Sequence, residues 1–170
     1  MPQSEPESAH PTVFLGGPFK GLIDPVTGRL READRARYTS LIDAFEERGW
    51  RVLSAHRTED WGAGLVSDRE CTRRDWEWMR ECSVFVAFPG RPASPGTHVE
   101  LGWASALGRP TVVLVEPDTE CAALVAGLPG IAPVRLLEHT GDPAEVCRAV
   151  TEAAGTGAAG SDAARTGAPA

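Results

Sequence analysis

The chain has 170 residues, of which 42% are hydrophobic and 24% charged, and its formal net charge is −7. This length suits one domain with a sizeable core, and an acidic chain without a basic patch argues against a nucleic-acid polymer as partner. The sequence has no run of 18 apolar residues, no apolar stretch of the signal-peptide kind near its start, and no C-x-x-C pair among its four cysteines. These features predict a cytoplasmic protein with reduced thiols and no contact with a membrane.

Strand-like and helix-like patterns alternate along the chain. Residues 1–11 are acidic and proline-rich, residues 153–170 are rich in Ala, Gly, Ser and Thr, and both segments are predicted to be disordered tails. Between them the patterns predict strands at 13–15, 52–55, 84–88, 111–115 and 133–137, and helices at 33–48, 67–80, 98–107, 119–126 and 142–153. We therefore expect residues 12–152 to form a single doubly wound α/β domain, with a five-stranded parallel sheet and helices on both faces.

Three loops follow strands of this predicted sheet. They span residues 16–32, 56–66 and 89–97. The carboxyl ends of parallel strands meet at one edge, where ligands of such folds bind. We therefore expect side chains from all three loops to meet in one site.

Two of these loops are rich in glycine. Gly16 and Gly17 follow the first strand, and Ser94 and Gly96 precede the third helix. Glycines let backbone N–H groups approach an anion closely, and a helix N-terminus favours negative charge. The loops are therefore candidates for holding one phosphate group, with Lys20 as a source of positive charge. The alternative for the double glycine is a plain turn after a strand.

Glu100 is placed on the first turn of the helix after the second glycine loop. In one interpretation its carboxylate faces a bound substrate. In the other, Thr97-x-x-Glu100 is a capping box, in which the glutamate serves only the helix terminus.

Asp75 is a candidate second carboxylate within the helix 67–80. The alternative is a solvated charge paired with a basic residue a turn away. Two carboxylates in different environments are the general equipment for cleaving a glycosidic bond through an oxocarbenium-like transition state. The two positions together predict a glycosidic site.

The second loop and the start of the first add four substrate-binding candidates. His56 and Arg57 follow the second strand, and Trp61 and Phe19 are aromatic side chains that could stack on a base. For His56 the alternative is a local hydrogen-bonding role, and for the two aromatic residues it is core packing.

These residues resemble the nucleoside 2-deoxyribosyltransferase superfamily. The resemblance rests on Gly16-Gly17 after the first strand, on Asp75 before the third, and on the segment 96–104, which has the form G-x-x-x-E-x-G-x-A. It covers about residues 12–140 and implies that Glu100 is the nucleophile at the anomeric carbon. In this superfamily a neighbouring subunit often completes the site, which implies a homodimer or larger assembly.

Finer features resemble one branch, the CMP-hydrolysing N-glycosidases of nucleoside-antibiotic pathways. The similarity includes Ala55-His56-Arg57, Trp61-Gly62-Ala63 and the string from Val84 to Ala104. Ser94 stands where the deoxyribosyltransferases carry an aspartate, and the branch uses a serine there to help bind a 5′-phosphate. Lys20 stands where the branch has an arginine beside the phenylalanine matching Phe19, in a region that helps select the pyrimidine.

The resemblance implies hydrolysis of the N-glycosidic bond of a pyrimidine nucleoside 5′-monophosphate, CMP or 5-hydroxymethyl-CMP, to the free base and ribose 5-phosphate. No metal or other cofactor is expected, because protonation alone can activate the leaving base. Two alternatives stay open: base exchange between deoxynucleosides, and a non-catalytic nucleotide-binding module.

Overall fold

The structure of the protein is a computed structural model that describes residues 10–91 and 93–165, with side chains up to residue 156. Residues 1–9 and 166–170, which belong to the two predicted tails, lie outside the described residues. The last helix of the structure continues to Arg165 and so includes residues 153–165 of the predicted C-terminal tail.

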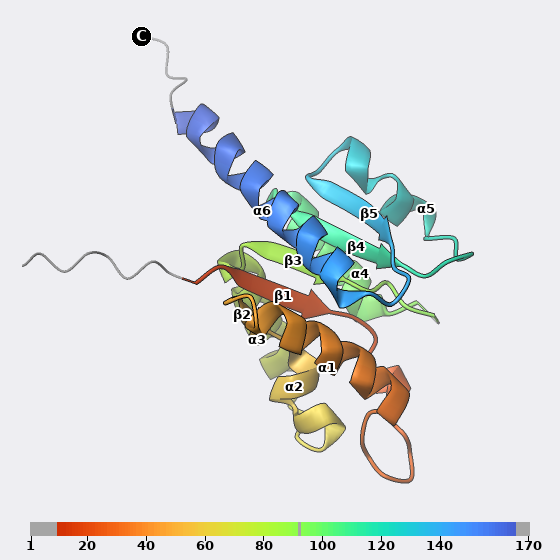
Figure 1. Ribbon diagram of the computed structural model, residues 1–170. Helices are drawn as coiled ribbons and strands as arrows, with labels where there is room; N and C mark the ends of the chain where they lie inside the picture. The colour runs from red at the N-terminus through yellow and green to blue at the C-terminus, as the bar shows by residue number, and fades with distance from the viewer. Residues whose placement is uncertain (1–9, 92, 166–170) are drawn as a thin grey trace, which may run out of the picture.

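Five parallel strands form one sheet (Figure 1). The strands are β1 (Thr12–Gly16), β2 (Arg51–Leu53), β3 (Val84–Ala87), β4 (Thr111–Val115) and β5 (Val134–Glu138). Their order across the sheet is β2-β1-β3-β4-β5. The chain first places β2 on one side of β1. It then crosses to the other side of β1 and adds β3, β4 and β5 in that order. This arrangement confirms the predicted doubly wound α/β fold.

Helices cover both faces of the sheet (Figure 1). On one face lie α1 (Glu32–Glu46) and α6 (Pro143–Arg165), and on the other lie α3 (Asp68–Glu81), α4 (Pro95–Ala106) and α5 (Ala123–Ala126). Successive side chains of a strand point to opposite faces, so β1 sends Val13 and Leu15 into the first core and Phe14 into the second.

The loop predicted at 56–66 contains short helical segments. They are α2 (Ala55–Thr58) and the 3₁₀ turn η2 (Asp60–Gly62). Two further 3₁₀ turns, η1 (Lys20–Leu22) and η3 (Leu128–Gly130), complete the elements of the described chain. Four-residue segments are too short for hydrophobic periodicity to reveal, which explains why the sequence predicts a loop there.

The start of α4 differs from the prediction in a way that matters for Glu100. The helix begins at Pro95, and Ser94 is its N-cap, with Oγ accepting from the Thr97 backbone N–H at 3.3 Å. The predicted helix start at residue 98 is therefore wrong, and so is the alternative in which Thr97 and Glu100 form a capping box. Glu100 lies in the second turn, beyond the reach of an N-terminal cap, and its carboxylate has another environment.

The topology brings the loops together. β1 and β3 are neighbours although about 70 residues of chain separate them, and the connections leaving these two strands turn to opposite faces. A crevice forms at such a switch point, outside the carboxyl ends of the strands. Among the described residues, no helix is long and apolar enough to span a membrane.

Candidate active site

A cavity of about 360 Å³ opens at the carboxyl ends of β1 and β3. It is lined by the loop after β1, the start of α2, one face of α3 and the first turns of α4. Nine residues that the sequence singles out line it together: Gly16, Gly17, Phe19, Lys20, His56, Asp75, Ser94, Gly96 and Glu100. The convergence expected of the three loops is therefore present.

Two predicted binding residues lie elsewhere. Arg57 turns away and forms an ion pair with Glu46 of α1 at 2.6 Å, and it donates to the Val52 carbonyl oxygen at 3.0 Å. Trp61 is buried under the Arg35 guanidinium, with the carbon of that group 5.2 Å from its ring. Neither residue lines the cavity, and their sequence positions in the same loop as His56 explain why they were expected there.

Glu100 reaches back from α4 to the end of β1. A Cβ atom at Gly16 would lie 2.7 Å from Glu100 Oε2 and 2.9 Å from the Phe85 ring, so only glycine leaves room for the carboxylate. Oε2 is buried and has no hydrogen-bond partner among the described residues. Burial in this place, reinforced by the charge of Asp75, raises the pKa of Glu100 from 4.5 to about 8.

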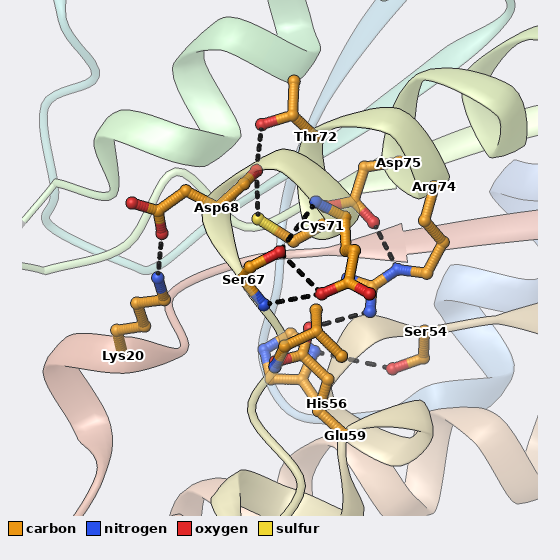
Figure 2. Close-up of polar contacts among 12 residues, drawn as sticks. Lys20, Ser54, His56, Glu59, Ser67, Asp68, Cys71, Thr72, Arg74 and Asp75 are labelled. Atoms are coloured by element: carbon orange, nitrogen blue, oxygen red, sulfur yellow. Dashed lines mark hydrogen bonds and ion pairs between the residues drawn. The ribbon is translucent and has the colours of Figure 1, made fainter.

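Asp75 projects from α3 into the same cavity, next to the partly buried Arg74 (Figure 2). Its Oδ1 accepts from Arg74 Nε at 2.9 Å, and Arg74 Nη1 forms an ion pair with Glu59 Oε1 at 2.8 Å. Burial raises the pKa of Asp75 even though Arg74 opposes the shift. Each of the two cavity carboxyl groups therefore has a raised pKa and holds its proton more firmly than it would in water.

The glycine loop is fixed from behind by two side chains. Tyr38 Oη donates to the Pro18 carbonyl oxygen at 3.2 Å, and His56 Nε2 donates to the same oxygen at 3.0 Å. The two rings stack with centroids 3.8 Å apart, and the Phe19 ring lies 4.7 Å from His56. A side chain at Gly17 would strike the Tyr38 hydroxyl. The double glycine thus provides room for Glu100 and Tyr38.

The same contacts define the state of His56. A carbonyl oxygen can only accept, so Nε2 carries the proton, and burial lowers the pKa of the ring from 6.5 to about 4. At neutral pH the ring is uncharged. His56 thus fills the local hydrogen-bonding role that the sequence left as its alternative, while one face of it borders the cavity.

The start of α4 presents donors to the opposite side of the cavity. Ser94 Oγ accepts from the Thr97 hydroxyl at 3.1 Å as well as from the Thr97 N–H. Both are accepted bonds, so the Ser94 hydroxyl keeps its own proton for a ligand. Gly96 lies beside it in the first turn, where the helix dipole favours an anion.

Lys20 lies at the rim, where its ammonium group forms an ion pair with Asp68 at 2.9 Å (Figure 2). The two side chains are 60% and 93% exposed, so the pair contributes little stability. It joins η1 to the first turn of α3 across the mouth of the cavity.

Three residues that support this site carry no sequence signal of their own. Arg74 and Glu59 belong to no motif, and Tyr38 lies within an ordinary helix. For Arg74 a signal exists, since it directly precedes Asp75, for which a basic partner is the alternative to a catalytic role.

A second, smaller cavity of about 180 Å³ adjoins the first beyond Pro18. Four of its charged groups are paired with each other: Arg31 with Asp34 at 2.8 Å and Arg37 with Glu116 at 2.9 Å. The larger cavity, with its unpartnered carboxylate oxygen, is the better candidate. Within residues 10–91 and 93–165 no cluster of three or more His, Cys, Asp or Glu side chains could hold a metal ion.

Comparisons with known proteins show what the chain is similar to in sequence and fold. The family model of the nucleoside 2-deoxyribosyltransferases matches residues 26–154. A CMP N-glycosidase of Clostridium botulinum, BcmB, is 32% identical over 81% of this chain and 95% of its own, with a TM-score of 0.58. The solution structure of BlsM is 43% identical over 84% of this chain and 88% of its own, with a TM-score of 0.70.

A 2-deoxyribosyltransferase of Bacillus psychrosaccharolyticus is 19% identical over 79% of this chain and 89% of its own, with a TM-score of 0.56. That likeness shows the fold alone. The comparison with curated proteins found no match.

Proposed function

Because this chain belongs to the nucleoside 2-deoxyribosyltransferase family, an enzyme superfamily of glycosyl transfer, we propose that it hydrolyses the N-glycosidic bond of a pyrimidine nucleoside 5′-monophosphate. The products are the free base and ribose 5-phosphate. The observation that carries the proposal is the buried Oε2 of Glu100, which has no hydrogen-bond partner among the described residues and shares one cavity with Asp75 and with the donors of Ser94 and Gly96. The 32% identity to a CMP N-glycosidase supports CMP or its 5-hydroxymethyl form as the substrate.

The carboxyl pair supplies both parts of the chemistry. The raised pKa of Glu100 places the proton on that residue in the free protein. We propose that this proton passes to Asp75 when substrate binds, so that Glu100 becomes the carboxylate that attacks C1′ or stabilises its developing positive charge, and Asp75 assists proton transfer to the leaving base. The bond from C1′ to the base nitrogen breaks and the base takes one proton from the pair. Water then delivers a hydroxyl group to C1′, and its remaining proton restores the pair. A carboxylate that accepts no hydrogen bond from the protein stabilises a cation formed beside it most strongly, because its negative charge has no other partner.

The polar end of the cavity suits the phosphate. Gly17, Ser94 and Gly96 are proposed to hold it, and the N-terminus of α4 adds a favourable dipole. Phe19 and Lys20 are proposed to contact the base, with the neutral His56 behind Phe19. We also retain the prediction of a homodimer or larger assembly, for which the exposed Trp76 and Val99 on α3 and α4 leave an apolar surface.

One assay tests the proposal. The protein is incubated with a panel of nucleoside 5′-monophosphates and with the matching nucleosides, and free base is followed by chromatography. We expect base release from CMP with kcat/KM at least roughly a hundredfold above that for cytidine, because polar groups left without their anion cost several kcal/mol. Equal kcat/KM values for CMP and cytidine would contradict the phosphate site.

The same assay separates the alternatives. A deoxynucleoside mixed with a second base reports base exchange if a new nucleoside appears. Binding of CMP without base release over hours identifies a nucleotide-binding module. Ser94, in place of an aspartate, disfavours an unphosphorylated sugar, and Ser94→Asp should severely impair CMP hydrolysis through charge repulsion.

A further inference from the structure

Glu59 is a buried carboxylate that the proposed chemistry leaves without a role. It follows α2 directly, and its side chain is 4% exposed. A buried charge is costly unless it is paired, and here Oε1 pairs with Arg74 while Oε2 accepts from the Val66 backbone N–H at 3.4 Å. The chain therefore maintains an ion pair in the wall of the cavity, at a place where an apolar contact would be less costly.

Arg74 is held on three sides. Nη1 faces Glu59 at 2.8 Å, Nε donates to Asp75 at 2.9 Å, and the guanidinium carbon lies 4.7 Å from the centre of the Trp78 ring. Trp78 is packed edge-on against Phe14 of β1. A guanidinium is planar and its donors have fixed directions, so fixing one edge and one face fixes the orientation of the remaining donors.

On this basis, and resting on the proposed function, we propose that Glu59 and Arg74 are positioning residues for the reaction: Glu59 fixes the guanidinium of Arg74, and Arg74 fixes the carboxyl group of Asp75 toward the substrate. Figure 2 shows Arg74 lying between the two carboxylates. Glu59 acts through Arg74, and Arg74 acts through Asp75.

The charge of Glu59 has a second consequence. Arg74 alone would place a positive charge beside the cavity, and the reaction develops positive charge at C1′. Glu59 offsets the charge of Arg74, so the arginine can orient Asp75 without opposing the transition state. The cluster should therefore affect kcat more than KM, since the positive charge at C1′ exists only in the transition state.

A double-mutant cycle tests this order of action. Glu59→Gln keeps the shape and an acceptor oxygen for Val66 but loses the charge. We expect it to lower kcat on CMP about tenfold with little change in KM, the scale of a small displacement of a reacting group. In an Asp75→Asn background the same change should lower kcat less than about twofold, because the group it positions is already altered.

Two further variants keep the test decisive. Arg74→Lys keeps the positive charge but loses the planar guanidinium with its fixed donors. It should therefore show the same non-additivity with Asp75→Asn, and it serves as the test if Glu59→Gln fails to fold. Glu152→Gln breaks an exposed ion pair with Arg135, of 2.6 Å, far from the cavity and should leave kcat unchanged. Equal losses in the wild-type and Asp75→Asn backgrounds, or no loss from either Glu59→Gln or Arg74→Lys, would overturn the proposal.

A measurement independent of turnover separates this proposal from the proposed function. In nitrogen NMR of arginine side chains, the Arg74 signals, assigned by their loss in Arg74→Lys, should show hindered rotation in the wild type and free rotation in Glu59→Gln. A wild-type protein that releases no base overturns the proposed function while leaving this readout intact. Freely rotating Arg74 groups in the wild type would overturn the positioning role whatever the activity.

Discussion

Two walls of the cavity differ in how completely their polar side chains are paired. The aromatic wall consists of Gly17, Pro18 and Phe19, backed by Tyr38 and His56. Its two polar side chains have a partner, because the Pro18 carbonyl oxygen accepts a hydrogen bond from each of them beneath the stacked rings. The charged wall consists of Glu59, Arg74, Asp75 and Glu100, and among the described residues it leaves Glu100 Oε2 and Arg74 Nη2 buried without partners.

This difference shows where the molecule has given up stability. Buried polar atoms without partners cost free energy, and they persist where a ligand or a reaction uses them. Changes to the charged wall should therefore act on chemistry and can even stabilise the fold, whereas changes to the aromatic wall should act first on the fold.

The largest expected effect is that of Glu100→Gln. If Glu100 is the nucleophile, kcat should fall roughly 10³-fold or more. The pKa of Glu100 is raised from 4.5 to about 8 on folding. Its contribution to stability is thus complete below pH 4.5 and is lost as the pH rises to about 8. Denaturant unfolding at pH 5 and pH 9 should show that the variant loses less stability than the wild type over this range. A folded variant with near-normal activity would refute the mechanism.

Gly16→Ala should have the next largest effect, because its Cβ would displace the Glu100 carboxylate from the end of β1. We expect kcat to fall about a hundredfold and stability to fall by about 1–3 kcal/mol. Gly102→Ala is the matched control on α4, since nothing lies within 4 Å of the added Cβ. Similar kinetics for the two variants would show that the carboxylate has room to move.

The shared proton predicts the pH dependence of the charged wall. The reaction as proposed needs one proton on the carboxyl pair, and the raised pKa values of Glu100 and Asp75 keep it there at neutral pH. Above about pH 8 the pair loses this proton, so kcat/KM should fall about tenfold per pH unit. A profile that keeps rising through pH 9 would mean that no proton is needed from the pair.

Tyr38→Phe tests the aromatic wall. It removes one of two donors to the Pro18 carbonyl oxygen and keeps the ring on His56. Stability should fall by about 1 kcal/mol, the usual net value of one hydrogen bond, while kcat changes only a few-fold. Thermal unfolding and steady-state kinetics measure both. A loss of kcat larger than that of Gly16→Ala would place the phenol in the chemistry and remove the contrast between the walls.

The smallest effect is expected at the rim. Lysine offers a point charge and arginine a fixed fork of donors, so Lys20→Arg should shift preference from CMP toward 5-hydroxymethyl-CMP about fivefold, or roughly 1 kcal/mol. Competition between the two nucleotides measures the ratio. Because Asp68 engages Lys20 in this structure, Asp68→Asn is the companion variant. An unchanged ratio in Lys20→Arg would place pyrimidine selection elsewhere in the cavity.

Apolar runs and glycine-rich loops explain why the sheet and its ligand-binding edge could be predicted from the sequence. The apolar runs of β1, β3 and β4 and the glycine loops that follow β1 and β3 define the sheet and its ligand edge, so pattern and resemblance could predict nine residues that line the cavity. Each of them lies at the end of a strand, in a loop that a parallel sheet must bring to that edge, or on the helix that follows.

The sequence could not predict the directions in which individual side chains point. Arg57 and His56 are adjacent, yet the turn of α2 sends one to Glu46 and the other to Pro18. Likewise the role of Ser94 as N-cap moves Glu100 one turn deeper into α4. Such choices are made by tertiary contacts that no local pattern records. The predicted assembly, cytoplasmic location and tail boundaries stay predictions.

The position of Lys20 also has a practical consequence. It is the only lysine in the 170 residues, and its side chain is 60% exposed at the mouth of the cavity. Amine-directed reagents thus find one lysine target, at the entrance that a ligand must pass. A fluorophore attached there would report occupancy of the cavity, whereas coupling to a solid support through that amine would hold the entrance against the surface and close it.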